Sequence, residues 1–257
     1  MDLGLENRHA LVTGASRGLG RAIASTLAAE GARVVAVARN LVRLNDLVAS
    51  TPPGRGTMLA RACDLADAAA IEGLGELLQD VDILVLNSGG PPPGPAADTP
   101  DAVWSRQFEA MLLCAARLTR LALPGMRKRG FGRILAVVSS GVTQPIPNLG
   151  VSNALRAALV GWAKTLASEV AREGITVNCI APGRIATDRV AELDQAKATR
   201  EGIDIRQVEK ESRAAIPAGR YGDAAEFASV AAFLASPRAS YMTGGVIRVD
   251  GGMIRGV

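Results

Sequence analysis

The chain has 257 residues, of which 48% are hydrophobic and 3% aromatic, and a formal net charge of +4 at neutral pH. This length predicts one α/β domain with a sizeable core, and the scarcity of aromatic side chains argues against nucleic-acid binding. No stretch approaches the roughly 18 apolar residues of a membrane span, so we expect no membrane partner. The three isolated cysteines, Cys63, Cys114 and Cys179, lack metal-binding spacing and favour a reducing, cytoplasmic location without a bound metal.

Strand-like and helix-like segments alternate along the chain. Predicted strands cover residues 10–12, 32–38, 58–62, 82–86, 134–138, 175–180 and 245–249. Predicted helices cover residues 21–30, 41–49, 66–78, 100–128, 151–172 and 223–234, with a Pro-Pro-Gly loop at residues 52–54. The alternation predicts a doubly wound, Rossmann-type α/β fold, with a parallel sheet of about seven strands and helices on both faces. We expect a single domain, residues 1–257, with a polar lid of one or two helices at residues 184–215.

A glycine-rich stretch lies between the first predicted strand and the first predicted helix. Gly14, Gly18 and Gly20 are spaced as Gly-x-x-x-Gly-x-Gly. Glycine lets the backbone approach a pyrophosphate closely, and the N-terminus of the next helix directs free amides at it. The spacing differs from Gly-x-Gly-x-x-Gly, and alone it is also compatible with a bare turn, but the flanking strand and helix favour dinucleotide binding. The loops after residues 86, 138 and 180 should face the same crevice, because ligands bind beyond the carboxyl ends of such strands.

The end of the second predicted strand indicates which coenzyme is preferred. An acidic residue there would bind the ribose 2′-hydroxyl of NAD(H), but this chain has Arg39, with Arg17 in the glycine-rich stretch nearby. Two guanidinium groups suit a 2′-phosphate, which favours NADP(H) over NAD(H). The alternative is that Arg39 is an ordinary solvated surface arginine.

Further short motifs are distributed over nearly the whole chain. They are Thr13-Gly14-x-x-x-Gly18-x-Gly20, Asp64-Leu65, Asn87-Ser88-Gly89, Ser139-Ser140, Val177-Asn178-Cys179-Ile180-Ala181-Pro182-Gly183, and Tyr241-Met242-Thr243-Gly244 followed by Asp250-Gly251-Gly252. Together they resemble the short-chain dehydrogenase/reductase family, and most of all its β-ketoacyl-acyl-carrier-protein reductases. The resemblance implies a carbonyl or alcohol oxidoreductase, with an acyl-carrier-linked 3-oxoacyl thioester as a candidate substrate. It also implies a homotetramer that pairs through its long helices and its C-terminal region.

The resemblance also assigns the cofactor site. It places the glycines at the pyrophosphate, Asp64 and Leu65 at the adenine, and Asn87 in the cofactor pocket. It places the Pro182-Gly183 turn at the nicotinamide carboxamide. With the two arginines named above, the predicted cofactor-binding residues are Gly14, Ser16, Arg17, Gly18, Leu19, Gly20, Arg39, Asp64, Leu65, Asn87, Gly89, Arg156, Pro182, Gly183, Ile185 and Thr187.

The catalytic positions of the family are changed in this chain. The family uses a serine, a tyrosine, a lysine four residues after it, and usually an asparagine on the preceding helix. Ser140 falls at the serine position, or Ser139 if no gap is allowed, whereas Ser152, Arg156 and Met111 occupy the tyrosine, lysine and asparagine positions. An aliphatic alcohol is a much weaker acid than a phenol, and a guanidinium does not readily give up a proton. Arg156 nevertheless keeps the spacing from which a cation can bond ribose hydroxyls.

Two alternatives therefore stay open. Ser152 is either a weak catalytic hydroxyl, acting with Ser140 and Arg156, or the N-cap of its helix. The chain is either an active oxidoreductase or a non-catalytic dinucleotide-binding protein, a sensor or assembly subunit on the same fold. Retention of the cofactor motifs favours the enzyme. His9 precedes the first predicted strand, away from the crevice, and is not expected to act as a base.

Overall fold

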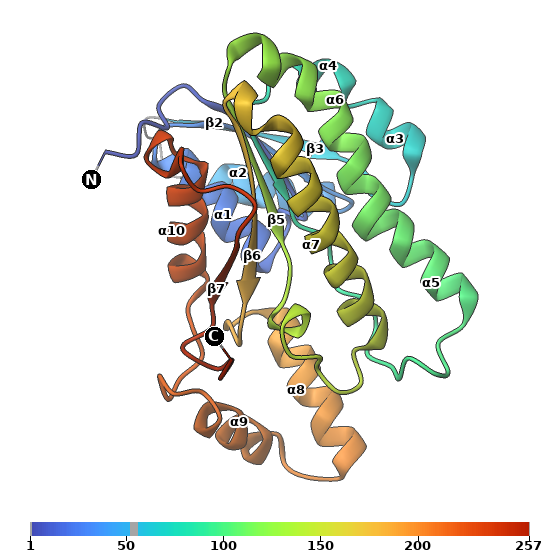
Figure 1. The fold of residues 1–257 in the computed structure, drawn as a ribbon. Coiled ribbons are helices and arrows are strands. Elements are labelled where there is room, and N and C mark those ends of the chain that lie inside the picture. The colour runs from blue at the N-terminus through green and yellow to red at the C-terminus, as the bar shows by residue number, and fades with distance from the viewer. Residues whose placement is uncertain (1, 52–55, 257) are drawn as a thin grey trace.

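The computed structural model describes residues 2–51 and 56–256, which form a parallel sheet covered by helices on both faces (Figure 1). The strands are β1 (His9–Thr13), β2 (Arg33–Ala38), β3 (Thr57–Ala62), β4 (Ile83–Leu86), β5 (Gly132–Val137), β6 (Ile175–Pro182) and β7 (Val246–Val249). Their order in the sheet is β3-β2-β1-β4-β5-β6-β7. All seven predicted strands and the doubly wound α/β fold are confirmed. The loop predicted at residues 52–54 lies outside the described residues.

The two faces of the sheet carry separate apolar layers. On one face pack α1 (Gly18–Ala29), α2 (Leu41–Ser50) and α10 (Ala224–Ala235). On the other face pack α3 (Ala68–Glu72), α4 (Gly75–Gln79), α6 (Cys114–Arg129) and α7 (Gly150–Val170). Because both faces are covered, the central strands are almost continuously apolar, and every residue of β4 and β5 is buried.

Two predicted helices are interrupted. The helix predicted at residues 66–78 is two short helices, α3 and α4, and Gly73 is the C-cap of α3; glycine disfavours a continuous helix because its backbone loses more conformational freedom than that of other residues. Asp67 begins α3 by accepting hydrogen bonds from two of its amides. The helix predicted at residues 100–128 runs as α5 (Asp101–Phe108), a π-helical segment η1 (Glu109–Leu113) and α6. Such π-segments occur frequently at functional sites, and this one carries Met111.

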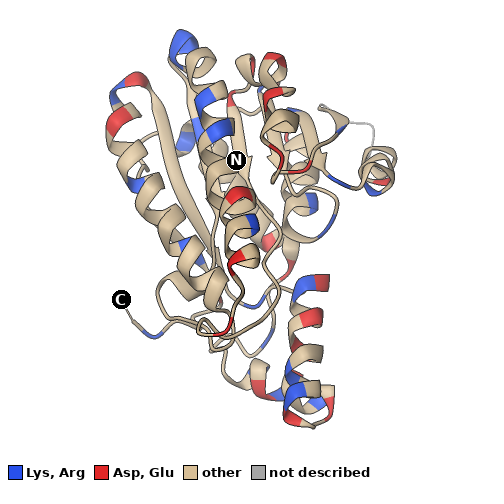
Figure 2. Ribbon diagram, turned by 90° about the vertical axis from the view of Figure 1, so that its right-hand side faces the viewer, with Lys and Arg blue, Asp and Glu red and all other residues tan. Residues whose placement is uncertain are grey.

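The segment predicted as a lid forms α8 (Asp188–Glu201) and α9 (Ile205–Ala214), beyond the carboxyl ends of the strands (Figure 1). Both helices are rich in charged residues (Figure 2). Lys197 Nζ of α8 lies 3.2 Å from Glu211 Oε2 of α9, which joins the two helices. None of the described helices combines the length and apolarity that crossing a membrane requires.

Candidate functional site

The glycine-rich loop after β1 packs against the end of β4. A Cβ atom added to Gly14 would lie 2.4 Å from the carbonyl oxygen of Asn87, and one added to Gly20 would lie 2.3 Å from the carbonyl oxygen of Gly14. The Asn87 amide donates to Thr13 Oγ1 at 2.8 Å, and Asn87 Nδ2 donates to the Thr13 carbonyl at 3.3 Å. Only glycine fits at these two positions, because the opposing atoms belong to backbone that is itself fixed.

The start of α1 fits the pyrophosphate of a dinucleotide. The helix begins at Gly18, which has φ +54°, and its N-cap residue Arg17 makes no side-chain hydrogen bond to the first amides. No acidic side chain occupies the first turn. The helix therefore presents free amides and a positive dipole end beside a loop whose backbone is closely packed at Gly14, and these groups suit a phosphate. Ser16 and Leu19, both partly buried, flank Arg17 and Gly18 in this loop.

The two arginines predicted for a 2′-phosphate have different surroundings. Arg39 follows β2 directly and is exposed. Arg17 instead pairs with the start of α8, where its Nη1 lies 2.6 Å from Glu192 Oε1 and 3.8 Å from Asp188 Oδ2. The hydrogen bond between them raises the pKa of Arg17 and lowers that of Glu192. The sequence did not indicate this pair, because its members are 175 residues apart.

The predicted adenine contacts lie at the end of β3. Asp64 accepts a hydrogen bond from the Ala66 amide at 3.1 Å, and its Oδ2 lies 3.4 Å from Nη2 of Arg106. Leu65 is partly buried beside it.

The turn after β6 meets the glycine-rich loop. The Gly183 amide donates to the Val249 carbonyl at 3.0 Å, and a Cβ atom added to Gly183 would lie 2.6 Å from Cα of Asp250. Ile185 is buried, and Thr187 lies against Gly18. Pro182 ends β6, and the approach of Thr187 to Gly18 places the predicted carboxamide contacts next to the predicted pyrophosphate contacts.

Two adjacent serines follow β5 and have different roles in the turn. Ser139 caps the short helix η2 (Ser140–Val142), because its Oγ accepts a hydrogen bond from the Gly141 amide at 3.0 Å. Ser140 is only 2% exposed. Both serines lie at the carboxyl edge of the sheet, next to the start of α7.

Helix α7 places Ser152 and Arg156 one turn apart. Because the helix begins at Gly150 with Leu149 as its N-cap, Ser152 lies inside the first turn, and the N-cap interpretation of Ser152 is wrong. The position of the cap was missed because the turn before α7 gives no capping side chain that the sequence would reveal. Ser152 is 9% exposed and Arg156 is 6% exposed.

The buried guanidinium of Arg156 joins the ends of two strands. Its Nη1 donates to the Val137 carbonyl of β5, and its Nη2 donates to the Ser88 carbonyl after β4 at 3.2 Å. Burial, with a contribution from the charge of Arg189, lowers the pKa of Arg156 to about 10. Arg156 therefore stays charged at neutral pH, and it is better suited to positioning than to proton transfer.

Met111, which the sequence resemblance predicts to stand at the family's asparagine position, is an apolar residue of the crevice. It is 2% exposed and packs with Val151 and Leu155. Cys114 lies about one turn further along the chain and donates its thiol to the Ala110 carbonyl at 2.9 Å. Burial raises the pKa of Cys114 to about 12, so this thiol stays neutral.

Arg189, which is not among the residues predicted from the sequence, reaches the same crevice. Its Nη2 donates to the Pro91 carbonyl at 2.6 Å, and a Cβ atom added to Gly90 would lie 3.1 Å from the same nitrogen. Gly89 precedes this contact and is exposed. The only signal in the sequence was that Arg189 follows Thr187, a predicted cofactor residue, by two positions.

A buried carboxylate anchors α8. Asp194 is 2% exposed, forms an ion pair with Nη1 of Arg184, and accepts a hydrogen bond from the Tyr221 hydroxyl at 2.7 Å. Arg184 follows β6 and Tyr221 precedes α10, so this cluster connects the lid segment to both of its ends.

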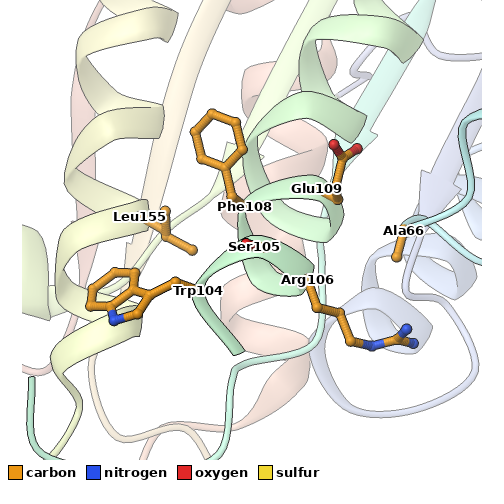
Figure 3. A pocket seen from close by; sticks show the side chains of 7 residues that line it. All are labelled: Ala66, Trp104, Ser105, Arg106, Phe108, Glu109 and Leu155. Carbon is orange, nitrogen blue, oxygen red and sulfur yellow. The ribbon is translucent and has the colours of Figure 1, made fainter. Parts of the chain in front are cut away.

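A larger cavity, of about 610 Å³, lies outside this crevice, on the surface formed by α5, η1 and α7 (Figure 3). It is lined by Ala66, Trp104, Ser105, Arg106, Phe108, Glu109 and Leu155. None of these is a predicted site residue. His9 lies at the start of β1, and Asp82 binds its amide, so it is at the opposite edge of the sheet from the crevice.

The fold and the glycine-rich loop define a dinucleotide-binding α/β protein. A family model described as enoyl-(acyl carrier protein) reductase matches residues 14–254. The 3-oxoacyl-[acyl-carrier-protein] reductase FabG of Salmonella typhimurium is 40% identical over 260 residues, which cover 98% of this chain and 99% of that protein.

Two solved structures are also similar to this chain over nearly its whole length. The L-sorbose reductase of Gluconobacter frateurii, complexed with NADPH and L-sorbose, has a TM-score of 0.93 and 34% identity and covers 100% of both chains. An actinorhodin polyketide ketoreductase with NADPH has a TM-score of 0.90 and 32% identity, and the match covers 96% of this chain and 97% of that one. The chain belongs to the short-chain dehydrogenase/reductase family of NAD(P)-dependent oxidoreductases.

Proposed function

We propose that this chain uses NADP(H) to interconvert a carbonyl and an alcohol, and that an acyl-carrier-linked 3-oxoacyl thioester is the first substrate to test. The observation that carries this proposal is the intact cradle formed by Gly14, Gly20 and Asn87 at the uncapped start of α1. The 3-oxoacyl reductase likeness supports the thioester, and the NADPH of the two structural neighbours supports the coenzyme.

The preference for NADP(H) rests on charge at the end of β2. Arg39 is exposed there, and no acidic residue takes the place at which a ribose 2′-hydroxyl would be bound. Arg17 contributes to the same phosphate only if it gives up or shares Glu192, so Arg39 is the primary contact in this proposal.

The chain's own groups must place the carbonyl and deliver a proton to its oxygen. Bound NADPH supplies the hydride that is transferred to the carbonyl carbon. The Ser140 hydroxyl binds the carbonyl oxygen, and Ser152 relays a proton from water to that oxygen. Arg156 keeps N–H donors beyond those bound to Val137 and Ser88, and these bind ribose hydroxyls and stabilise negative charge on the oxygen.

The proposal is tested by a double variant that places the family's tyrosine and lysine at positions 152 and 156 of α7. Ser152→Tyr combined with Arg156→Lys should raise turnover, because a phenol beside a lysine is a far better proton donor than an aliphatic alcohol. Ser152→Ala should lower kcat by about two to four powers of ten if Ser152 relays the proton, and by only a few fold if it is filler.

NADPH binding must be measured on the same variants. If the parent and the restored variant both bind NADPH but reduce no substrate in a panel of ketones and 3-oxoacyl thioesters, the reductase proposal fails. The non-catalytic sensor or assembly role would then replace it.

We also propose that residues 1–257 work as one domain in which residues 184–215 close over the crevice. The Arg17 contacts to Asp188 and Glu192 support this, because they join the lid segment to the glycine-rich loop. Cofactor-dependent protection of α8 amides from hydrogen exchange would test the closure.

A homotetramer is a further proposal. Phe108 is 41% exposed and lines the cavity on α5, η1 and α7, so this face has apolar surface that a second copy of the chain would cover (Figure 3). Light scattering at micromolar concentration tests it, and a monomeric mass would refute it. A cytoplasmic location stays part of the proposal, supported by the three free, buried cysteines.

A further inference from the structure

Two guanidinium groups from different helices meet on one short loop after β4. Arg156 of α7 binds the Ser88 carbonyl at 3.2 Å, and Arg189 of α8 binds the Pro91 carbonyl at 2.6 Å. Arg189 also lies directly over Gly90, where a Cβ atom would meet its Nη2, Nε and Cζ atoms at 3.1 to 3.3 Å. The loop between Ser88 and Pro91 is thus held between two cations, one from the sheet side and one from the lid.

These cations are poorly neutralised by the part of the chain that the structure describes. Both hydrogen-bond acceptors of the Arg156 guanidinium are backbone carbonyls. The one carboxylate paired with Arg189 is Glu192, at 3.8 Å, and the other oxygen of Glu192 is engaged by Arg17 at 2.6 Å. Burial is the main cause of a lowered pKa at both Arg156 and Arg189, so each cation has lost part of its hydration.

Two partly desolvated like charges beside one another are unfavourable unless an anion joins them. A guanidinium with unused N–H donors binds a carboxylate through two parallel hydrogen bonds, a geometry that also fixes the orientation of the bound molecule. Arg189 donates to the Pro91 carbonyl through Nη2, and its Nη1 lies 3.8 Å from Glu192, so Nε and the second N–H of Nη2 are the donors left for a ligand.

We propose that Arg189 recognises a carboxylate on the carbonyl substrate, so that the preferred substrate is an oxo acid or the matching hydroxy acid. This inference rests on the proposed carbonyl reduction, and it favours a free oxo acid over the uncharged 3-oxoacyl thioester as the substrate. Arg156 adds a second positive charge beside the loop, and its own role is to position groups through its contacts to the Val137 and Ser88 carbonyls. A phosphate of the coenzyme is the competing anion, and the measurements below separate the two.

The test uses the full chain loaded with NADP⁺ and a series of oxo acids of increasing chain length, each paired with its methyl ester. Calorimetry gives the affinity of each compound without requiring turnover, and NADPH oxidation gives kcat/KM. In the parent protein, the acid should bind about ten- to a hundred-fold more tightly than its ester. Arg189→Met should remove this difference, and Arg189→Lys should restore part of it because the charge returns without the fork.

Arg200→Met is the matched control. Arg200 lies in the last turn of the same helix, is 48% exposed and pairs with Glu201, so its loss removes the same charge from α8 without reaching the loop. The control should keep the parent's preference for acids. Thermal melting of each variant identifies any that fails to fold, and Arg189→Lys supplies the comparison if Arg189→Met does.

The possible outcomes separate carboxylate recognition by Arg189 from the proposed reductase activity. Acid binding that depends on Arg189 but yields no turnover would uphold the inference and reject the reductase. Equal affinity of acid and ester in the parent, or equal losses for both in Arg189→Met, would overturn the inference. A weaker NADPH affinity in Arg189→Met with an unchanged preference for acids would overturn it too and assign Arg189 to the coenzyme.

Discussion

Replacing Asp194 by asparagine tests what holds the lid segment in place. The change keeps the size of the side chain but removes the charge that faces Arg184 and accepts the Tyr221 hydroxyl at 2.7 Å. Asp194 is 2% exposed, whereas the Arg184 side chain is 27% exposed. The substitution therefore leaves a guanidinium without its partner in a site that water reaches only partly.

The loss of stability expected from Asp194→Asn follows from the burial of this ion pair. Removing one partner of a fully buried ion pair costs about 3–5 kcal/mol, and the partial exposure of Arg184 reduces the expected cost to roughly 2–3 kcal/mol. The other contact of the lid, Arg17 with Glu192, has side chains that are 46% and 48% exposed, so its loss should cost about 0–1 kcal/mol. Asp194, rather than Glu192, should therefore determine the stability of α8.

Hydrogen exchange of the backbone amides measures this directly. In Asp194→Asn, the amides of α8 and α9 should exchange about thirty- to 140-fold faster, since a tenfold change corresponds to about 1.4 kcal/mol. Amides of β4 and β5 should keep their rates if the opening is local. Tyr221→Phe should show a smaller increase in the same helices, because it removes one hydrogen bond and leaves the ion pair. Parent-like exchange of α8 in Asp194→Asn, or a larger effect in Glu192→Gln, would refute this reasoning.

Three further predictions concern the coenzyme site and the cysteines. Arg39→Asp should weaken NADPH far more than NADH in a fluorescence titration, because it removes a phosphate partner and adds a repelling charge; equal losses would reject the NADP(H) assignment. Gly20→Ala should abolish coenzyme binding and lower the melting temperature, since its Cβ would lie 2.3 Å from the Gly14 carbonyl oxygen, and near-parent values in both assays would show that the loop yields. Cys114 and Cys179, whose pKa values burial raises to about 12, should resist iodoacetamide at mildly alkaline pH until the protein is unfolded, as followed by mass spectrometry; rapid labelling of the native protein would contradict this.

The sequence predicted the sheet well because strand and helix periodicity are local properties. All seven strands were found with ends shifted by at most two residues. Local signals failed where one residue changed the path of a helix, as at Gly73 between α3 and α4 and in the π-segment that contains Met111. The start of α7 was likewise hidden, because Leu149 caps it without a side-chain bond.

The candidate site was only partly predictable for a different reason. The glycines and Asn87 could be named from the sequence because each belongs to a short motif with a recognisable spacing. Their close backbone contacts in the structure agree with that assignment. The contacts of Arg17 with Glu192 and of Arg189 with Pro91 join residues 175 and 98 positions apart. Such pairs depend on where α8 packs, and no pattern within the segment at residues 184–215 indicates that position.

Transfer of a labelled hydride tests the central claim most directly. The protein would be incubated with a carbonyl substrate and NADPH that carries deuterium at the hydride-donating position, and the product would be analysed by mass spectrometry. The account predicts an alcohol with one deuterium on the former carbonyl carbon and an unlabelled hydroxyl in ordinary water. Tight NADPH binding with no deuterated alcohol from any oxo acid, ketone or 3-oxoacyl thioester would contradict it.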